Sequence, residues 1–419
     1  MFRRIALLTA AALAVAGLAL PAANAQPKKK KAAKKHHVHK VHRSTHLLVG
    51  LNDEVDTLYG NPAAAFATLH ALKSQVLRVN LYWGGNKWAV ANSKPLDAED
   101  PGDPAYNWKI YDRLARYAAT YKIRVVFSIV YTPAWANGGK AKSIAPTNMQ
   151  DLQDFAKAAA ARYSGYWIPP AWQEDTTLAP SGTPLPLINS WTAWNEPNSP
   201  VWLSPQWKKV GKKKAVPVAA RTYAGICNAV YNGVHSVIVN NKGDRPPGEQ
   251  VACGVTDPRG NNSAVGKRSS TDPLSFLTAA HAAGMKTFDV YAHNPYSSAG
   301  KEAPAFVPKG KRARNIQLGN INTLLKLISK YYGPKHLWIT EYGYQTNPPD
   351  KTIFGTSWKN QALYLKQAWQ LAYRNPRIDM FLWFLVKDEK PIGGWQSGLA
   401  TWNGKHKPAW KTFRNLPRG

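Results

Sequence analysis

Two glutamates stand out because of the segments that precede them. Glu196 follows the apolar segment 191–194, in the run Trp-Thr-Ala-Trp-Asn-Glu-Pro-Asn, and Glu341 follows the apolar segment 337–340, in Leu-Trp-Ile-Thr-Glu-Tyr-Gly-Tyr. Neither apolar segment gives a stability reason for a carboxylate. Two carboxyl groups can act as a general acid and a nucleophile when their surroundings separate their pKa values. For either glutamate taken singly, a structural ion pair with a nearby Lys or Arg is the alternative interpretation.

Eight short segments rich in Val, Ile, Leu and aromatic residues alternate with longer segments of helical period. We predict strands over 47–51, 76–83, 123–131, 187–194, 251–256, 288–292, 337–342 and 380–386. Both faces of these segments are apolar, as in a parallel sheet that is covered on both sides. Asn61 and Pro62 are typical of a helix start after the first strand. Eight such alternations predict an α/β fold, a single (β/α)8 barrel with long loops; a doubly wound sheet is the alternative.

Both glutamates fall at carboxyl ends of predicted strands, the fourth and the seventh. In a (β/α)8 barrel the active site lies at that face, in the loops that follow the strands. We therefore expect Glu196 and Glu341 to share one mouth of the barrel.

This arrangement resembles the retaining glycoside hydrolases of clan A, which include cellulases, β-xylosidases and β-mannanases. In that clan an Asn-Glu pair ends strand four and a Glu ends strand seven. The matching residues are Asn195, Glu196 and Glu341, and the resemblance covers about 47–413. It implies that Glu196 is the acid/base and Glu341 the nucleophile. The chain would then hydrolyse O-glycosidic bonds of a β-linked polysaccharide or oligosaccharide by double displacement.

The chemistry accounts for these residue types. Retention needs one carboxylate to attack the anomeric carbon and one carboxylic acid to protonate the leaving oxygen, about 5 to 5.5 Å apart. Strands four and seven face each other across a barrel mouth. Arg78 lies on the second strand, where the clan carries an arginine near the nucleophile, and a fixed cation there would keep Glu341 ionised. A buried structural ion pair is the alternative role for Arg78.

The resemblance also implies substrate-binding residues. Asn195 is expected to donate to the sugar 2-hydroxyl, with a local turn role as its alternative. After the sixth strand, His293 is expected to bind sugar and Tyr296 to contact the nucleophile through its hydroxyl. Trp383 is our predicted platform under the cleaved sugar, although core packing is the safer interpretation for any single tryptophan.

The N-terminal region has the pattern of an export signal followed by a basic tail. Residues 1–25 place Arg3 and Arg4 before an apolar run and end in Ala-Asn-Ala, which predicts a cleaved secretory signal peptide; retention as an anchor is the alternative. Residues 26–46 are rich in Lys and His and nearly free of apolar side chains, which predicts a disordered tether. The histidines could chelate a metal, but a solvated cationic arm is the preferred interpretation. The catalytic domain is expected to span 47–419.

The charge of the chain indicates anionic partners. The formal net charge is +31, of which Arg3 and Arg4 carry two and residues 26–43 eight, which leaves +21 on residues 44–419. Outside a cell this excess predicts attraction to anionic cell-wall surfaces. Twelve cations in the loops after strands four, five and six favour an acidic glycan as substrate, with merely solvated loops as the alternative: Lys208, Lys209, Lys212, Lys213, Lys214, Arg259, Lys267, Arg268, Lys309, Lys311, Arg312 and Arg314.

Other signals set limits on the function. No metal, phosphate-loop or dinucleotide signature occurs, so neither a cofactor nor a catalytic metal is expected. Nucleic acid has no motif behind it, and a monomer is expected. Cys227 and Cys253 could form a disulfide in an oxidising compartment or remain as two buried thiols. The rival function is a non-catalytic protein that binds a cell-wall polysaccharide or exopolysaccharide on the same barrel.

Overall fold

The computed structural model describes residues 46–209, 215–265, 269–391 and 393–418. They belong to one compact unit, which runs from His42 to Gly419. The predicted signal peptide and nearly all of the tail lie outside the described residues. No helix within the described ranges is long and apolar enough to span a membrane.

Eight parallel strands form a closed barrel in the order β1-β10-β9-β8-β7-β4-β3-β2, which confirms the predicted (β/α)8 fold and excludes the doubly wound sheet. The barrel strands are β1 Leu48–Asn52, β2 Val76–Tyr82, β3 Arg124–Val130, β4 Ser190–Ala193, β7 Gln250–Thr256, β8 Val290–His293, β9 His336–Tyr342 and β10 Ile378–Phe384. Each coincides with a predicted segment. The loop after β4 contains a small antiparallel pair that was not predicted, β5 Trp207–Lys208 and β6 Val216–Pro217.

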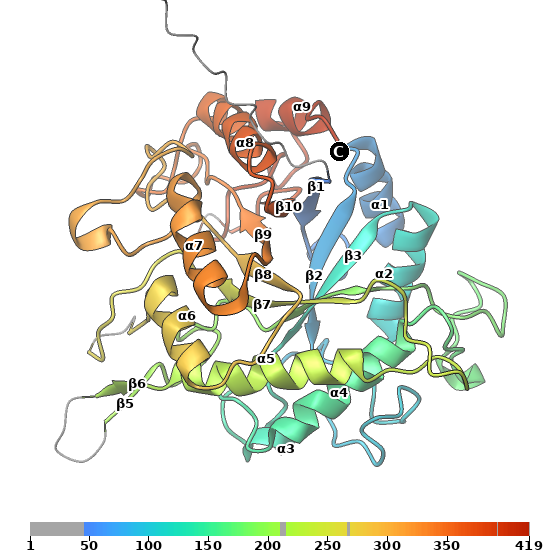
Figure 1. The fold of residues 1–419 in the computed structure, drawn as a ribbon. Coiled ribbons are helices and arrows are strands. Elements are labelled where there is room, and N and C mark those ends of the chain that lie inside the picture. The colour runs from blue at the N-terminus through green and yellow to red at the C-terminus, as the bar shows by residue number, and fades with distance from the viewer. Residues whose placement is uncertain (1–45, 210–214, 266–268, 392, 419) are drawn as a thin grey trace, which may run out of the picture. The chain divides into compact units, whose positions relative to one another are not determined.

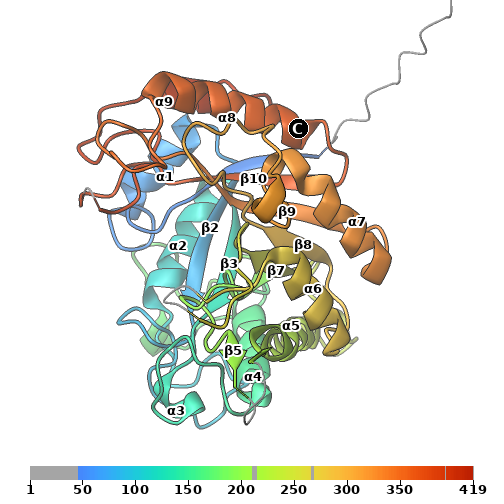
Figure 2. The same ribbon diagram turned by 90° about the vertical axis from the view of Figure 1, so that its left-hand side faces the viewer.

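Helices surround the strands (Figures 1 and 2). They are α1 Pro62–Ala71, α2 Lys109–Thr120, α3 Ala134–Asn137, α4 Met149–Arg162, α5 Ala219–His235, α6 Pro273–Ala282, α7 Ile321–Tyr332, α8 Trp358–Tyr373 and α9 Pro408–Arg414. The Asn61 side chain accepts a hydrogen bond from the Ala64 amide and Pro62 opens α1, as the sequence predicts.

Within the described residues, the apolar core has two main parts because side chains alternate along each strand. One buried cluster, which lines the barrel interior, includes Val76, Val126, Trp338, Met380 and Leu382. The larger cluster lies between the strands and the helices, and takes the intervening side chains of the same strands. A residue's place in this alternation therefore decides whether it faces the barrel interior or the helices.

The carboxyl ends of the strands break the regular alternation. β9 carries one extra residue opposite Leu382, and β7 carries Val255 as an extra residue opposite β8. Positive φ angles occur just after β4, at Trp194 (73°) and Glu196 (37°), and in the β7 bulge at Val255 (46°). Such conformations are unfavourable for residues other than glycine and concentrate at functional sites. They aim side chains that a regular strand would turn elsewhere.

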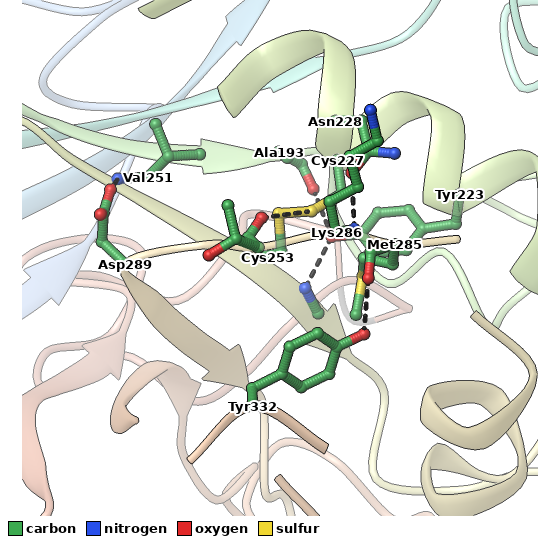
Figure 3. The surroundings of a disulfide bond; sticks show 12 residues. Ala193, Tyr223, Cys227, Asn228, Val251, Cys253, Met285, Lys286, Asp289 and Tyr332 are labelled. Carbon is green, nitrogen blue, oxygen red and sulfur yellow. Dashed lines mark hydrogen bonds between the residues drawn. A yellow bond between two sulfur atoms is a disulfide. The ribbon is translucent and has the colours of Figure 1, made fainter. Parts of the chain in front are cut away.

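Cys227 on α5 and Cys253 on β7 form a disulfide with a Cα–Cα distance of 5.8 Å (Figure 3). Both residues are fully buried. Tyr223, one turn earlier on α5, accepts a hydrogen bond from the Gly254 amide and donates one to the Ala193 carbonyl. The disulfide and this hydroxyl together attach α5 to two adjacent strands just below the barrel mouth.

Candidate active site

Glu341 lies at the end of β9 with both carboxylate oxygens occupied by side chains of the barrel. The Arg78 guanidinium donates to Oε1 at 2.5 Å, and the Tyr296 hydroxyl donates to Oε2 at 3.1 Å. The side chain is 12% exposed and Arg78 only 1%. The β9 bulge turns Glu341 into the mouth, where a buried positive charge and a hydroxyl fix its position. The expected contact between Tyr296 and this glutamate is confirmed.

Arg78 is held by a layer of polar side chains inside the barrel. Its Nε donates to the Ser128 hydroxyl at 2.8 Å, and the Thr192 hydroxyl donates to the same oxygen at 2.7 Å. These three residues come from the neighbouring strands β2, β3 and β4. Since guanidinium N–H groups are strongly directional donors, this layer fixes the side on which Arg78 meets Glu341.

Asn195 is oriented by the same arginine. Arg78 donates to the Asn195 side-chain oxygen at 2.9 Å, and Asn195 is only 2% exposed. Because a guanidinium can only donate, the amide oxygen must face Arg78, which leaves the NH2 group to donate elsewhere. Arg78 therefore links Glu341 on β9 to the Asn-Glu pair that follows β4.

Glu196 is placed by the kink after β4. The Val255 carbonyl, displaced by the β7 bulge, accepts a hydrogen bond from the Glu196 amide at 2.8 Å. The side chain is half-buried, and the Asn294 amide nitrogen donates to its Oε1 at 3.0 Å. The bulged end of β7 thus holds the backbone of this glutamate, and Asn294, which follows β8, holds its carboxyl group.

Glu196 and Glu341 lie in opposite electrostatic surroundings. Burial raises the pKa of Glu196 well above its ordinary value, and the negative charges of Asp257 and Glu341 raise it further. Glu341 has a guanidinium in direct contact. One carboxyl group is therefore favoured in its neutral form beside another that carries a cationic partner.

The structure corrects the role expected for His293. This residue is fully buried; its Nδ1 accepts from the Thr256 hydroxyl at 2.8 Å and its Nε2 donates to the Ile316 carbonyl at 2.9 Å. Burial lowers the pKa of His293 to about 4, which fits this neutral form. With no exposed surface and both ring nitrogens occupied, it cannot bind a sugar. Its side chain faces the helices because alternate residues of β8, Val290 and Ala292, face the barrel interior.

The side chain of Asn294, one position later, faces the barrel interior, and it is one of two site residues that sequence reasoning missed. Its amide nitrogen contacts Glu196, and its amide oxygen accepts from the Thr340 hydroxyl at 2.7 Å. Because the oxygen is committed to Thr340, the NH2 group must face the carboxyl. Continuing the inward alternation along β8 by one more step would have identified it.

The prediction for Trp383 is wrong for the same reason. Its indole is fully buried in the outer cluster and donates to the Ser397 carbonyl at 2.9 Å, so it offers no face to a ligand. The aromatic rings that reach the mouth are others. Trp395 is 40% exposed and lies 5.7 Å from the Tyr296 ring, and Trp202 stacks on Tyr131 at 5.0 Å. These two tryptophans lie near the two glutamates and are candidate stacking surfaces.

A third carboxyl group, Glu54, follows β1 and was also missed. It accepts hydrogen bonds from the Asn80 amide and from the hydroxyls of Tyr59 and Tyr82, at 2.7, 3.0 and 2.9 Å. Burial raises its pKa above the ordinary value. Burial and the charges of Glu54 and Glu196 also raise the pKa of Tyr131 to about 12, so this tyrosine lies within reach of both carboxyl groups.

The cations expected around the mouth are in part neutralised. Arg259 pairs with Asp257 at 3.6 Å, Arg312 with Glu302 at 2.7 Å and Arg314 with Asp272 at 2.9 Å. Lys208, Lys209, Lys309 and Lys311 are exposed. Lys212, Lys213, Lys214, Lys267 and Arg268 lie outside the described residues. Among the residues that are described, no group of three or more His, Cys, Asp or Glu side chains could hold a metal ion.

Comparisons with known proteins place the chain by its fold. No family model and no curated protein matches the sequence. Among solved structures, a family 39 glycoside hydrolase from Bacteroides cellulosilyticus WH2 is 18% identical with a TM-score of 0.56, over 89% of this chain and 63% of its own. A glucosidase from Croceicoccus marinus is 13% identical with a TM-score of 0.57, over 89% and 65%.

A β-glucosidase from Exiguobacterium marinum is 12% identical with a TM-score of 0.53, over 89% of this chain and 98% of its own. The chain shares its fold with glycoside hydrolases. It spans less than two thirds of the length of the first two of these structures. At these identities the likeness concerns the fold, and the chemistry has to be argued from the residues at the mouth.

Proposed function

We propose that this protein is a secreted retaining glycoside hydrolase of clan A that cleaves O-glycosidic bonds of a β-linked polysaccharide or oligosaccharide, with Glu341 as nucleophile and Glu196 as acid/base. One observation carries the proposal: the two carboxyl groups share the barrel mouth in opposite electrostatic surroundings. The β-glucosidase among the structural neighbours supports a β-linked substrate. Arg3, Arg4 and the apolar run after them support export.

The proposed mechanism assigns each proton and bond to a group at the mouth. Glu341 attacks the anomeric carbon while Glu196 gives its proton to the leaving oxygen, and the glycosidic C–O bond breaks. Glu196 then takes a proton from water, whose oxygen attacks the anomeric carbon and releases Glu341. The NH2 group of Asn195 donates to the sugar 2-hydroxyl, and Trp395 or Trp202 supplies the flat surface beside a sugar ring.

The test uses substitutions at the two carboxyl residues and measures hydrolysis of aryl β-glycosides. Glu341→Gln keeps the shape of the side chain but removes the nucleophile, and kcat/KM should fall by at least about 10⁴-fold. Azide should restore turnover of Glu341→Ala with inverted product stereochemistry, since a small anion replaces the missing carboxylate. Glu196→Ala should lose about 10²- to 10⁴-fold on substrates with poor leaving groups and little on dinitrophenyl glycosides, which need no acid.

Glu99→Gln is the matched control, because Glu99 is an exposed carboxylate paired with Lys157 and should leave activity unchanged. Near-normal turnover by both Glu341→Gln and Glu196→Ala would overturn the assignment. Two results together would favour the rival polysaccharide-binding function. The wild-type protein would bind β-linked polymers without releasing product from any of them, and the Glu341→Gln variant would bind these polymers as tightly as the wild type.

A further inference from the structure

The face of the barrel opposite the mouth holds a concavity of about 700 Å³. It lies where β1, β2 and β3 begin, and α9 and the C-terminal end of the chain lie beside α1 and β1 (Figure 1). Its lining contains six basic side chains and no Asp or Glu: His70, Lys73, Lys122, Arg124, Arg414 and Arg418. A site of this size falls in the range of small-ligand sites, well above the volume of a single inorganic ion.

Four cations of this basic pocket have no ion-pair partner among the described residues, unlike three arginines at the mouth. Lys73, Lys122, Arg124 and Arg414 are exposed, and within the described ranges none of the four forms an ion pair. Arg418 has a separate role: its guanidinium donates to the carbonyls of Leu72, Lys73 and Phe413 and holds the C-terminal end on α1. Burial lowers the pKa of Arg418 to about 10, so it too is charged at neutral pH.

Two of the lysines occupy backbone positions that favour glycine. Lys73, in the turn from α1 to β2, has a φ of 57°, and Lys122, in the turn from α2 to β3, has a φ of 55°. In the turns after α6 and α7 the chain uses glycine, Gly284 and Gly333, with φ of 91° and 77°. The two turns that border the basic pocket therefore place a charged side chain where glycine would be less strained.

We propose that the basic pocket binds the anionic groups of an acidic glycan polymer and holds the protein on that polymer while the mouth at the opposite face stays open. Unpaired cations around a concavity without carboxylates concentrate oxyanions. The lining contains no Trp, Tyr or Phe to stack on nucleobases, and its only larger apolar residue is Leu48. Both observations favour a glycan over a nucleic acid or a membrane. The binding does not depend on the proposed hydrolysis.

The experiment measures binding of the full chain to polygalacturonate and to a phosphodiester-bearing mannan, with a neutral mannan for comparison. The pocket variant combines Lys73→Gly, Lys122→Gly, Arg124→Gln and Arg414→Gln; the glycines suit the local backbone, and Arg418 is kept. The control removes four exposed lysines from α7 and α8: Lys326→Gln, Lys330→Gln, Lys359→Gln and Lys366→Gln. Both variants lose the same net charge.

The pocket variant should bind the acidic polymers at least tenfold more weakly at physiological salt, and the control less than twofold. The two polymers distinguish carboxylate from phosphodiester as the bound group. Turnover of a small soluble substrate should stay within twofold, which separates this proposal from the proposed activity. Equal losses in both variants would show a general charge effect and overturn it. Tighter, pocket-dependent binding of a DNA duplex or of anionic vesicles would overturn it in favour of those partners.

A measurement on the wild-type chain tests the proposal without depending on whether the pocket variant folds. Acetylation of lysines in the presence of polygalacturonate should spare Lys73 and Lys122 and leave Lys326 and Lys366 as reactive as before. Restoring charge with Lys73→Arg and Lys122→Arg should keep binding within about twofold. Unprotected Lys73 and Lys122 at saturating polymer would contradict the proposal independently of any substitution.

Discussion

At the scale of single residues, the mouth is organised by what each polar group can donate. Arg78 has only donors, so it orients both Glu341 and the amide of Asn195. Asn294 is oriented in turn by Thr340 and directs its NH2 group to Glu196. The protonation states that the proposed chemistry requires thus depend on a few neighbours whose removal should shift the pH profile in defined directions.

Asp257 and Asn294 should move the basic limb of the pH profile in opposite directions. The Asp257 charge raises the pKa of Glu196 and the Asn294 hydrogen bond lowers it. The proposed acid must be protonated, so the basic limb of kcat/KM reports its pKa. Asp257→Asn should move that limb to lower pH, and Asn294→Ala should move it to higher pH. At its own pH optimum, the kcat/KM of Asn294→Ala should stay within about a hundredfold of the wild-type value, and that of Asp257→Asn within about tenfold.

If Asp257→Asn and Asn294→Ala shift the basic limb of the pH profile in the same direction, that limb reports the pKa of a group other than Glu196. Glu302→Gln serves as control, because Glu302 pairs with Arg312 in the loop after β8 and is not among the groups that shift the pKa of Glu196. Its basic limb should coincide with that of the wild type.

At the scale of elements, apolar patterning predicts the barrel and its eight strands but not where the side chains at their ends point. The resemblance implies a sugar contact for His293, and Trp383 is our predicted sugar platform at the mouth. The alternation places Phe384 and Asn294 there instead. The bulges at Val255 and in β9 arise from pairing between strands that are remote in sequence. The bulges leave no local pattern in the sequence, so the residues assigned in advance, Glu196, Glu341, Arg78, Asn195 and Tyr296, were found through the resemblance of their motifs.

The disulfide between α5 and β7 is an element-scale constraint with a measurable contribution. It closes a segment of 26 residues, for which chain entropy predicts roughly 3 to 4 kcal/mol of stabilisation. Cys227→Ala with Cys253→Ala should therefore lower Tm by several degrees while the barrel still forms. A thiol reductant should lower the Tm of the wild type toward that of the variant and leave the variant unchanged. Equal melting of the oxidised wild type and the variant would contradict this.

At the scale of the whole molecule, the described arginines at the two ends of the barrel differ in their ion pairing. Three arginines near the mouth have carboxylate partners, whereas four cations of the basic pocket have none among the described residues. The strand that borders this pocket, β1, is also where the basic segment 26–43 joins the barrel in sequence. Attachment to an anionic polymer and entry of substrate are thus assigned to opposite faces.

This separation predicts that salt will affect retention more than turnover. Deleting residues 26–43 should leave Tm and soluble-substrate kinetics nearly unchanged and reduce retention on anionic cell walls at low salt. Combining the deletion with the pocket variant should reduce retention further, with free-energy losses that add, because a tether and a folded pocket make separate contacts.

The kcat/KM on a soluble acidic polymer should fall only a few-fold between low and physiological ionic strength, since the mouth arginines are paired. A steep fall would instead assign electrostatic steering to the exposed lysines of the mouth, and a large loss of Tm on deletion would show that the tail packs on the barrel.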